Sequence, residues 1–500
     1  MMTHLPVFLP MVLLLGSLFV VLRPRQGEGG AFWVSIGAVA LAAVFAVVGL
    51  FMAVAEGRVT YDLGGWMPPV GIELVLDPLS AFFCVMMTLV ALPVLIHGRE
   101  RIQQEAAGRV PAFYSAALLL LGGLIGMVLT GDLFNLYVFL EISSLASYAL
   151  LAVGGKGAPV AAFRYLILGT IGASLYLLGV AFIFMETGTL NMAELKMIVP
   201  TMEITPGMAA AAVLIVVGIG LKLALFPLHG WLADAYTFAS SASTNLVAPI
   251  GTKVAAYVLI RIFFFLYATD FVKDGIHLTT IVGWMGAGGI IWGSLMAIAQ
   301  KDFKRMLAYS SVAQVGYIAL GIGLANPLAL IGAVLHAFAH CFMKAACFMV
   351  QTNFLHRLGH CDITRLTHQT RIAMPWTCAA FAVASLSMIG LPPTIGFFSK
   401  WYLLLGCIEE GAWIFLSVLL LSTLLNAVYF FRVLEKVYLR SDGEAYGEED
   451  ESKDRATSRR EVAAAMLWPT LILSAGLLVF GFANAWIVTE FLLPMLPHPF

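Results

Sequence analysis

The sequence predicts an all-α polytopic membrane protein with about fourteen transmembrane helices in a single membrane domain spanning 1–500. Of the 500 residues, 61% are hydrophobic and only 11% are charged, whereas a soluble domain is about 25% charged. Apolar runs of roughly 20 residues, long enough to cross a hydrocarbon core of ~30 Å, recur along the whole chain. A formal net charge of −1 argues against a nucleic-acid partner, which requires a clustered basic face.

The apolar runs define fourteen spans, and the first is a retained helix because no small-residue cleavage site follows it. Two spans are too long for one plain helix and contain proline, at Pro249 and at Pro392-Pro393. Proline kinks a helix, and the freed backbone groups must then be satisfied by protein or water. We therefore expect both of these helices to be broken. The spans are 4–22, 32–54, 77–97, 112–130, 132–153, 161–185, 207–229, 238–268, 278–299, 305–323, 327–353, 372–408, 411–433 and 464–488.

The basic residues support this topology. With both termini external, twenty of the 28 lysines and arginines fall in cytoplasmic loops, five lie inside spans and three (Arg58, Lys196 and Lys273) are external. This asymmetry is the one that the positive-inside rule predicts, and it favours a bacterial inner (cytoplasmic) membrane. The alternating stretches 59–63 and 72–76 around Gly64-Gly65 indicate an external β-hairpin. The polar stretch 441–460 is a predicted cytoplasmic loop.

Two opposite charges stand out inside the spans, Glu141 in 132–153 and Lys222 in 207–229. A charged side chain at mid-bilayer costs ~2.5–3.5 kcal/mol on insertion scales. An opposed pair would hold both groups charged, and loosening it would let the lysine release its proton. This is a hypothesis of a proton switch. The alternative is a static ion pair that holds two helices together.

Further titratable groups follow in the second half of the chain. Lys253 lies four residues after Pro249, and Lys400 follows the Pro392-Pro393 break. The spacing i, i+4, i+8 places His336, His340 and Lys344 on one helical face. Because histidine exchanges protons near neutral pH, this face is a candidate proton wire that we expect to point into the bundle. Zinc binding by the two histidines is the alternative.

Other charged residues have simpler interpretations. Arg261, near a helix end, is expected to extend towards the membrane surface. Asp132 is either an entrance carboxylate or a helix N-cap, and Asp234 caps or lines the cytoplasmic mouth between two spans. The six cysteines form no CxxC pair, which argues against a disulfide framework or an iron–sulfur site. No dinucleotide, P-loop or haem motif is present, so we expect no cofactor and no redox chemistry in the chain itself.

Five segments of the chain, 71–80, 130–141, 221–232, 304–314 and 336–344, carry a specific resemblance. They resemble the antiporter-like subunits shared by Mrp sodium/proton antiporters and respiratory complex I. The stretch 130–141 looks most like the D-type member of the Mrp antiporters. The resemblance extends over nearly the whole chain.

The resemblance implies two inverted five-helix repeats, 112–268 and 278–433, each with a broken helix. It also implies roles for the buried residues. Glu141 and Lys222 would be the coupling pair, Lys253 the relay and Lys400 the terminal proton site, with the middle wire formed by His336, His340 and Lys344.

Two functions follow from the resemblance. The first is a proton-translocating subunit of a multi-subunit sodium/proton antiporter, an ion transporter and not an enzyme. The second is a proton-pumping membrane subunit of an NADH–quinone oxidoreductase or a membrane-bound hydrogenase. A free-standing solute carrier is a weaker third. The expected partners are other membrane subunits, protons, sodium and the lipid bilayer, and the identity of co-purifying chains would separate the first two.

Overall fold

The predicted fold class is confirmed. The computed structural model describes residues 2–22, 27–267, 269, 271–439 and 461–497, so the predicted loop 441–460 lies outside the described residues. Within these ranges, thirteen helices are long and apolar enough to cross a membrane. They are α1 (Leu5–Leu22), α2 (Gly27–Glu56), α3 (Pro78–Glu105), α4 (Val110–Leu129), α5 (Leu133–Leu151), α6 (Ala158–Thr187), α8 (Pro206–Leu223), α10 (Ser241–Arg261), α11 (Leu278–Ala299), α12 (Phe303–Leu324), α13 (Pro327–Leu358), α17 (Trp413–Tyr438) and α19 (Ala464–Phe482).

The remaining described helices are short. Two of them, α15 (Pro375–Ile389) and α16 (Ile395–Glu409), together form the predicted span 372–408. The others are α7 (Met192–Ile198), α9 (Leu232–Phe238), α14 (His368–Ala373), α20 (Asn484–Ile487), the π-helical stretches Ile262–Leu266, Phe271–Gly275 and Val488–Leu492, and 3-10 turns at Met2–His4, Leu63–Gly65, Val199–Thr201, Ile363–Arg365 and Leu493–Met495.

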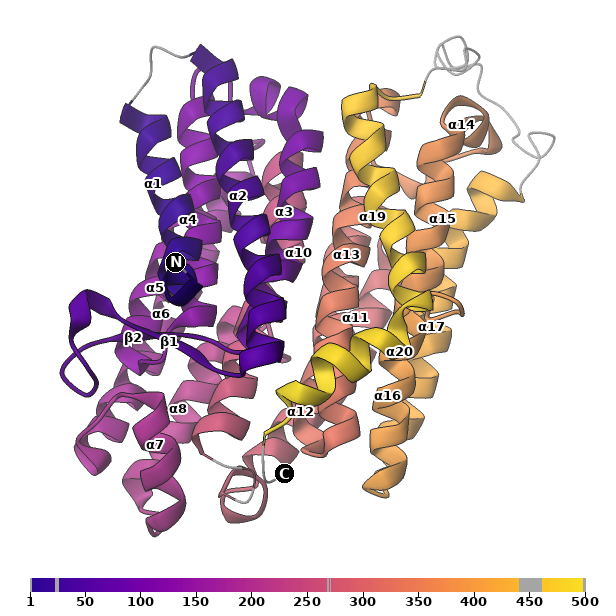
Figure 1. Ribbon diagram of the computed structural model, residues 1–500. Helices are drawn as coiled ribbons and strands as arrows, with labels where there is room; N and C mark the ends of the chain where they lie inside the picture. The colour runs from indigo at the N-terminus through magenta and orange to yellow at the C-terminus, as the bar shows by residue number, and fades with distance from the viewer. Residues whose placement is uncertain (1, 23–26, 268, 270, 440–460, 498–500) are drawn as a thin grey trace.

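The helices lie side by side in two halves, with the N-terminal half beside the C-terminal half (Figure 1). Helix α13 is enclosed almost completely, because it packs against α3, α10, α12, α15, α16 and α19. Helices α2, α6, α17 and α19 instead expose large apolar side chains such as Phe163, Leu424 and Trp468, as expected for surfaces in contact with lipid. The polar residues on α13 are therefore inside the protein.

One predicted helix break is confirmed. Helix α15 ends at Ile389, where Gly390 has a φ of +92°. Residues 391–394 contain Pro392 and Pro393, and α16 begins at Ile395.

The other predicted break was wrong. Pro249 lies inside α10, which continues without interruption from Ser241 and is buried along its length. The proline removes one backbone donor, and the helix nevertheless continues past it to Arg261. The break lies one span earlier, between α8 and α9, where Ala224 adopts a left-handed φ of +58°. Pro227 and Gly230 follow before α9 begins at Leu232.

The order of the helices is consistent with the expected repeats. Helices α4, α5, α6, α8–α9 and α10 form one series of five, and α11, α12, α13, α15–α16 and α17 form a second. In each series the fourth member is the broken helix. The inverted relation between the two series stays a prediction.

The predicted β-hairpin is confirmed. Strand β1 (Val59–Asp62) pairs antiparallel with β2 (Glu73–Leu76), with Val59 opposite Leu76. A further bridge between Leu74 and Thr130 joins the hairpin to the α4–α5 connection. We call this side of the bundle the hairpin end, and the other side, where α3 ends at Glu105, the opposite end (Figure 1).

The glycines of α11 serve helix packing. A Cβ at Gly286 would lie 2.6 Å from the backbone nitrogen of Leu320, and one at Gly293 would lie 2.6 Å from that of Ala313. Small residues allow such close backbone contact between membrane helices. Helix α12 is thereby fixed against α11 along its length.

Candidate functional site

Lys222 lies in the last turn of α8, just before the helix break, and is 8% exposed. Its ammonium donates hydrogen bonds to Ser144 Oγ at 2.7 Å and to Tyr148 OH at 2.8 Å, both on α5. The break is closed by Trp231, whose Nε1 donates to the carbonyl of Leu221 at 2.8 Å. The lysine is thus fixed at the point where α8 ends.

The expected direct ion pair between Glu141 and Lys222 is not formed. In the described part of the chain, no carboxylate oxygen lies within 4.0 Å of the Lys222 ammonium. Glu141 is half-buried, and its Oε1 is enclosed without a hydrogen-bond partner. Glu141, Ser144 and Tyr148 recur at i, i+3 and i+7, so they share one face of α5. The sequence placed both residues in membrane spans. It could not show how deep in the membrane each side chain lies or towards which neighbouring helix it points.

Lys253 lies in the middle of α10 and is fully buried. Its ammonium donates to the carbonyl of Ala248 in its own helix at 3.0 Å. The acceptor directly precedes Pro249, so the lysine is held by backbone beside the proline, although the helix itself is unbroken. Helix α10 packs against α13, which carries His336, His340 and Lys344.

The three candidate wire residues on α13 are fully buried, so this face points into the protein as expected. The two nitrogens of His336 contact Ser399 Oγ at 2.9 Å and Gln314 Oε1 at 3.0 Å. Neither nitrogen of His340 has a partner, and its ring centre lies 6.1 Å from that of His336. Lys344 donates to the carbonyl of Leu307 at 2.7 Å and to the hydroxyl of Ser310.

The zinc alternative receives no support from this arrangement. Both nitrogens of His336 are already engaged by Ser399 and Gln314. Among the residues that the structure describes, no group of three or more histidine, cysteine or acidic side chains could hold a metal ion.

Lys400 lies in the second turn of α16, after the second break. Its ammonium donates to the carbonyls of Met388 and Ile389, both at 2.9 Å. These are among the last carbonyls of α15, which have no partner within their own helix and carry the negative end of the helix dipole. The ammonium also lies 4.7 Å from the centre of the Tyr317 ring. Lys400 therefore caps the half-helix that precedes it.

Four lysines and two histidines thus form what we call the base row: Lys222, Lys253, His340, Lys344, His336 and Lys400. Within the described residues, each of its lysines has only neutral hydrogen-bond acceptors. Further buried polar atoms without partners include His340 Nδ1 and Nε2, Gln314 Nε2, Thr252 Oγ1, Ser385 Oγ and Ser387 Oγ. Buried polar groups are normally satisfied by protein or ordered water, and these atoms have no protein partner.

Sequence reasoning missed the neutral partners of the base row. Ser144, Tyr148, Gln314, Ser399 and Tyr317 carry no charge, so the cost of membrane insertion does not mark them. Helical spacing could have found some of them, because Ser144 and Tyr148 lie three and seven residues after Glu141.

Two of the simpler interpretations are now decided. Arg261 does not extend to the surface. It forms an ion pair with Asp77, the N-cap of α3, and its Nε donates to Tyr257 OH at 2.7 Å. Asp132 is the N-cap of α5, because its Oδ1 accepts from the backbone nitrogen of Asn135 at 2.7 Å.

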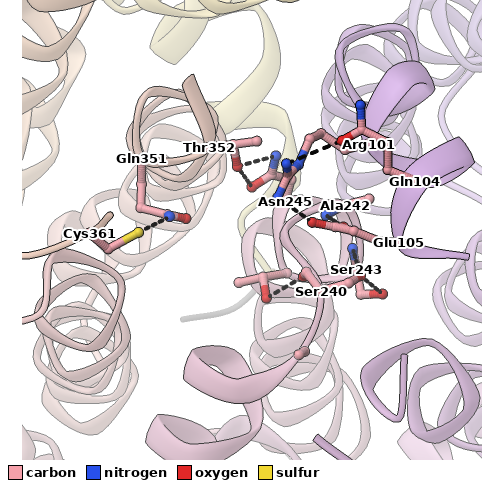
Figure 2. Close-up of polar contacts among 12 residues, drawn as sticks. Arg101, Gln104, Glu105, Ser240, Ala242, Ser243, Asn245, Gln351, Thr352 and Cys361 are labelled. Carbon is pink, nitrogen blue, oxygen red and sulfur yellow. Dashed lines mark hydrogen bonds and ion pairs between the residues drawn. The ribbon is translucent and has the colours of Figure 1, made fainter. Parts of the chain in front are cut away.

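The opposite end carries a second polar cluster, shown in Figure 2. Arg101 pairs with Glu105 at 2.7 Å, and the other carboxylate oxygen of Glu105 accepts from the backbone nitrogen of Ala242 at 3.3 Å. One turn further into α10, Asn245 is hydrogen-bonded to Thr352 of α13 at 3.1 Å. Glu105 therefore caps the first turn of α10.

A polytopic helix bundle with two broken helices and enclosed lysines has the architecture of an ion-translocating membrane protein. The chain matches the family described as NADH:quinone oxidoreductase/Mrp antiporter, TM, over residues 130–426, and it belongs to this family. The resemblance seen in the sequence is therefore confirmed at the level of the family.

Individual relatives span both branches of the family. The chain is 45% identical to the N-type subunit of NADH-quinone oxidoreductase from Desulforudis audaxviator, with 99% of each chain covered. It is 32% identical to the D-type subunit of the Na(+)/H(+) antiporter from Alkalihalophilus pseudofirmus, with 88% of this chain and 87% of that one covered. Among solved structures, a chain of the Mrp complex from a Dietzia species matches with a TM-score of 0.87 and 25% identity, over 99% of this chain and 96% of that chain.

Proposed function

We propose that this chain translocates protons across the membrane along the base row. The observation that supports this most is that its four lysines are buried without a carboxylate in contact. Burial without a counter-ion disfavours the charged form of a lysine, so the neutral and protonated forms become closer in free energy. A group in that condition can gain and lose a proton during a transport cycle.

The proposed roles are those that the resemblance implies. Lys222 receives or releases a proton under the influence of Glu141, which lies on the same face of α5 as the two hydroxyls that bind Lys222. Lys253 is the relay to the residues on α13, since its helix α10 packs against α13. His336, His340 and Lys344 form the middle of the path, and Lys400 is the terminal site. Water at the unpartnered polar atoms would complete the connections.

The repeats 112–268 and 278–433 and the orientation with both termini external are part of this proposal. The matching position of the broken helix in each series supports the repeats. The excess of basic residues on one side supports the orientation.

We further propose that the chain works inside a redox-driven assembly. The 45% identity to an N-type subunit over nearly the full length supports an NADH–quinone oxidoreductase or a related complex. The chain itself would then carry out proton transfer and no redox chemistry. The second candidate is the sodium/proton antiporter that the sequence first suggested, supported by the 32% identity to a D-type antiporter subunit and by the structural match to an Mrp complex.

The test of proton translocation uses the complete complex in everted membrane vesicles. Glu141→Ala and Lys222→Ala are each expected to abolish proton transport while the complex still assembles. The matched control is Leu145→Ala, since Leu145 is on the same helix α5 and is 60% exposed. Near-normal transport by both charge-removing variants would refute the proposal.

Purification of the native complex separates the two assemblies. Co-purifying chains with iron–sulfur centres, together with transport driven by an electron donor, would support the redox-driven complex. Small membrane subunits and sodium-dependent proton exchange without an electron donor would support the antiporter.

A further inference from the structure

The short helix α9 is held both by Arg164 of α6, which pairs with Asp234 at 3.4 Å, and by a helix outside its own repeat. It follows the break after Lys222 and leads directly into α10, the helix of Lys253. At its C-cap, the carbonyl of Ala239 accepts a hydrogen bond of 2.6 Å from the ammonium of Lys304, in the first turn of α12. In its first turn, Asp234 lies 3.2 Å from the guanidinium of Arg305, also on α12. Helix α12 therefore binds both ends of α9.

Lys304 is buried at the contact between α9 and α12. It is 7% exposed, and the other charged or titratable groups that act on it are Glu105, Asp302, Cys361 and Arg101. Glu105 in turn binds the first turn of α10 through the backbone nitrogen of Ala242 (Figure 2). The α9–α10 junction is thus held on one side by a base from α12 and on the other by an acid from α3.

The same helix α12 supplies acceptors to the base row. The carbonyl of Leu307 and the hydroxyl of Ser310 bind Lys344, and Gln314 Oε1 contacts His336 at 3.0 Å. Positions 304, 307, 310 and 314 fall on one side of a helix with 3.6 residues per turn. One continuous helix therefore contacts α9 in its first turn, and Lys344 and His336 one to three turns further on.

We propose that α12 couples the Lys222 break to the wire on α13, and that Lys304 is the positioning residue that ties α9 to α12; this inference rests on the proposed proton translocation. A change in the charge of Lys222 alters its hydrogen bonds at the end of α8 and displaces α9. Through Lys304 the displacement reaches α12. A shift of about 0.5 Å there is enough to take a contact such as Gln314–His336 out of hydrogen-bond range.

Three variants of Lys304 test the positioning role in the complete complex. Lys304→Met removes the donor, and proton transport is expected to fall at least about tenfold, the factor that corresponds to ~1.4 kcal/mol. Lys304→Arg keeps the charge and the donor but holds its proton near neutral pH, and it is expected to retain transport. If Lys304 were a proton carrier, the arginine variant would fail as well, and that result would overturn the proposal. Lys301→Met, at an exposed lysine three residues earlier, is the matched control.

The coupling itself is measured by hydrogen exchange with mass spectrometry over 232–242 and 303–314. Lys222→Ala is expected to change exchange in both segments. In the Lys304→Met background, the change at 303–314 is expected to disappear, which a merely stabilising role for Lys304 would not produce. Lys304→Leu, which likewise removes the donor, replaces the methionine variant if that one does not assemble.

The outcomes separate the two proposals. Normal transport by Lys304→Met, or no change at 303–314 in Lys222→Ala, overturns the coupling role of α12 even if Lys222→Ala abolishes transport. Normal transport by Lys222→Ala overturns proton translocation through Lys222. The contact between α9 and α12 would then have no role in proton transport.

Discussion

Substitutions of Lys400 can separate the contribution of this side chain to protein stability from its contribution to proton transport. Its ammonium binds two carbonyls at the end of α15, Met388 and Ile389, both at 2.9 Å. Lys400→Leu leaves both buried acceptors without a partner, at about 1–3 kcal/mol each. The leucine variant is therefore expected to lose about 2–6 kcal/mol of stability as well as proton transport.

Lys400→Gln is the matched variant, because its amide still donates hydrogen bonds but exchanges no proton. We expect it to recover most of the stability and none of the transport. Lys400→Arg, which keeps the charge and the donors but not a releasable proton, should behave in the same way. The measurements are thermal unfolding of the purified complex and proton uptake by everted vesicles. Normal proton uptake by the glutamine variant would refute the role of Lys400 as a proton site.

Two further predictions concern the packing beside Lys222 and the ion pair between α3 and α10. A Cβ at Gly169 would lie 2.0 Å from Tyr148 OH and 3.0 Å from Lys222 Nζ. Gly169→Ala should therefore displace both groups and lower proton uptake at least about tenfold, the factor that corresponds to ~1.4 kcal/mol. Unchanged proton uptake would contradict the close contact. Asp77→Asn should lower the stability of the complex by about 3 kcal/mol, because removing one partner of a buried pair leaves Arg261 uncompensated. The double variant Asp77→Asn, Arg261→Gln should be no less stable than the single one in thermal unfolding, and additive losses would show that the two residues act independently.

Local patterns predicted most of the fold. Apolar run length located every long span, alternation around two glycines located the hairpin, and Pro392-Pro393 located one break. The other break was missed because Pro227 and Pro249 are equally disruptive in a sequence. Packing against neighbouring helices decides which of them ends a helix, and that packing involves residues far away in the chain.

The candidate site was predictable in its charges but not in its contacts. Glu141 and Lys222 stand out because a charge in a span is costly, yet the groups that bind Lys222 are hydroxyls with no such cost. Arg261 was misinterpreted for a related reason. Its partner Asp77 lies on another helix, and nothing local to either residue indicates the pairing.

The lysines next to the two helix breaks are bound by different kinds of hydrogen-bond acceptor, and this gives them different capacities for proton transfer. Lys222 is bound by the hydroxyls of Ser144 and Tyr148, and a hydroxyl can accept one proton while donating another. Lys400 is bound by backbone carbonyls, which accept a hydrogen bond but have no proton to give. Under the proposed function, a proton on Lys222 would be able to continue through the hydroxyls that bind it, whereas a proton on Lys400 would be able to leave only to water or another base. In that case the hydroxyl acceptors at the first break pass a proton on, and the carbonyl acceptors at the second break do not.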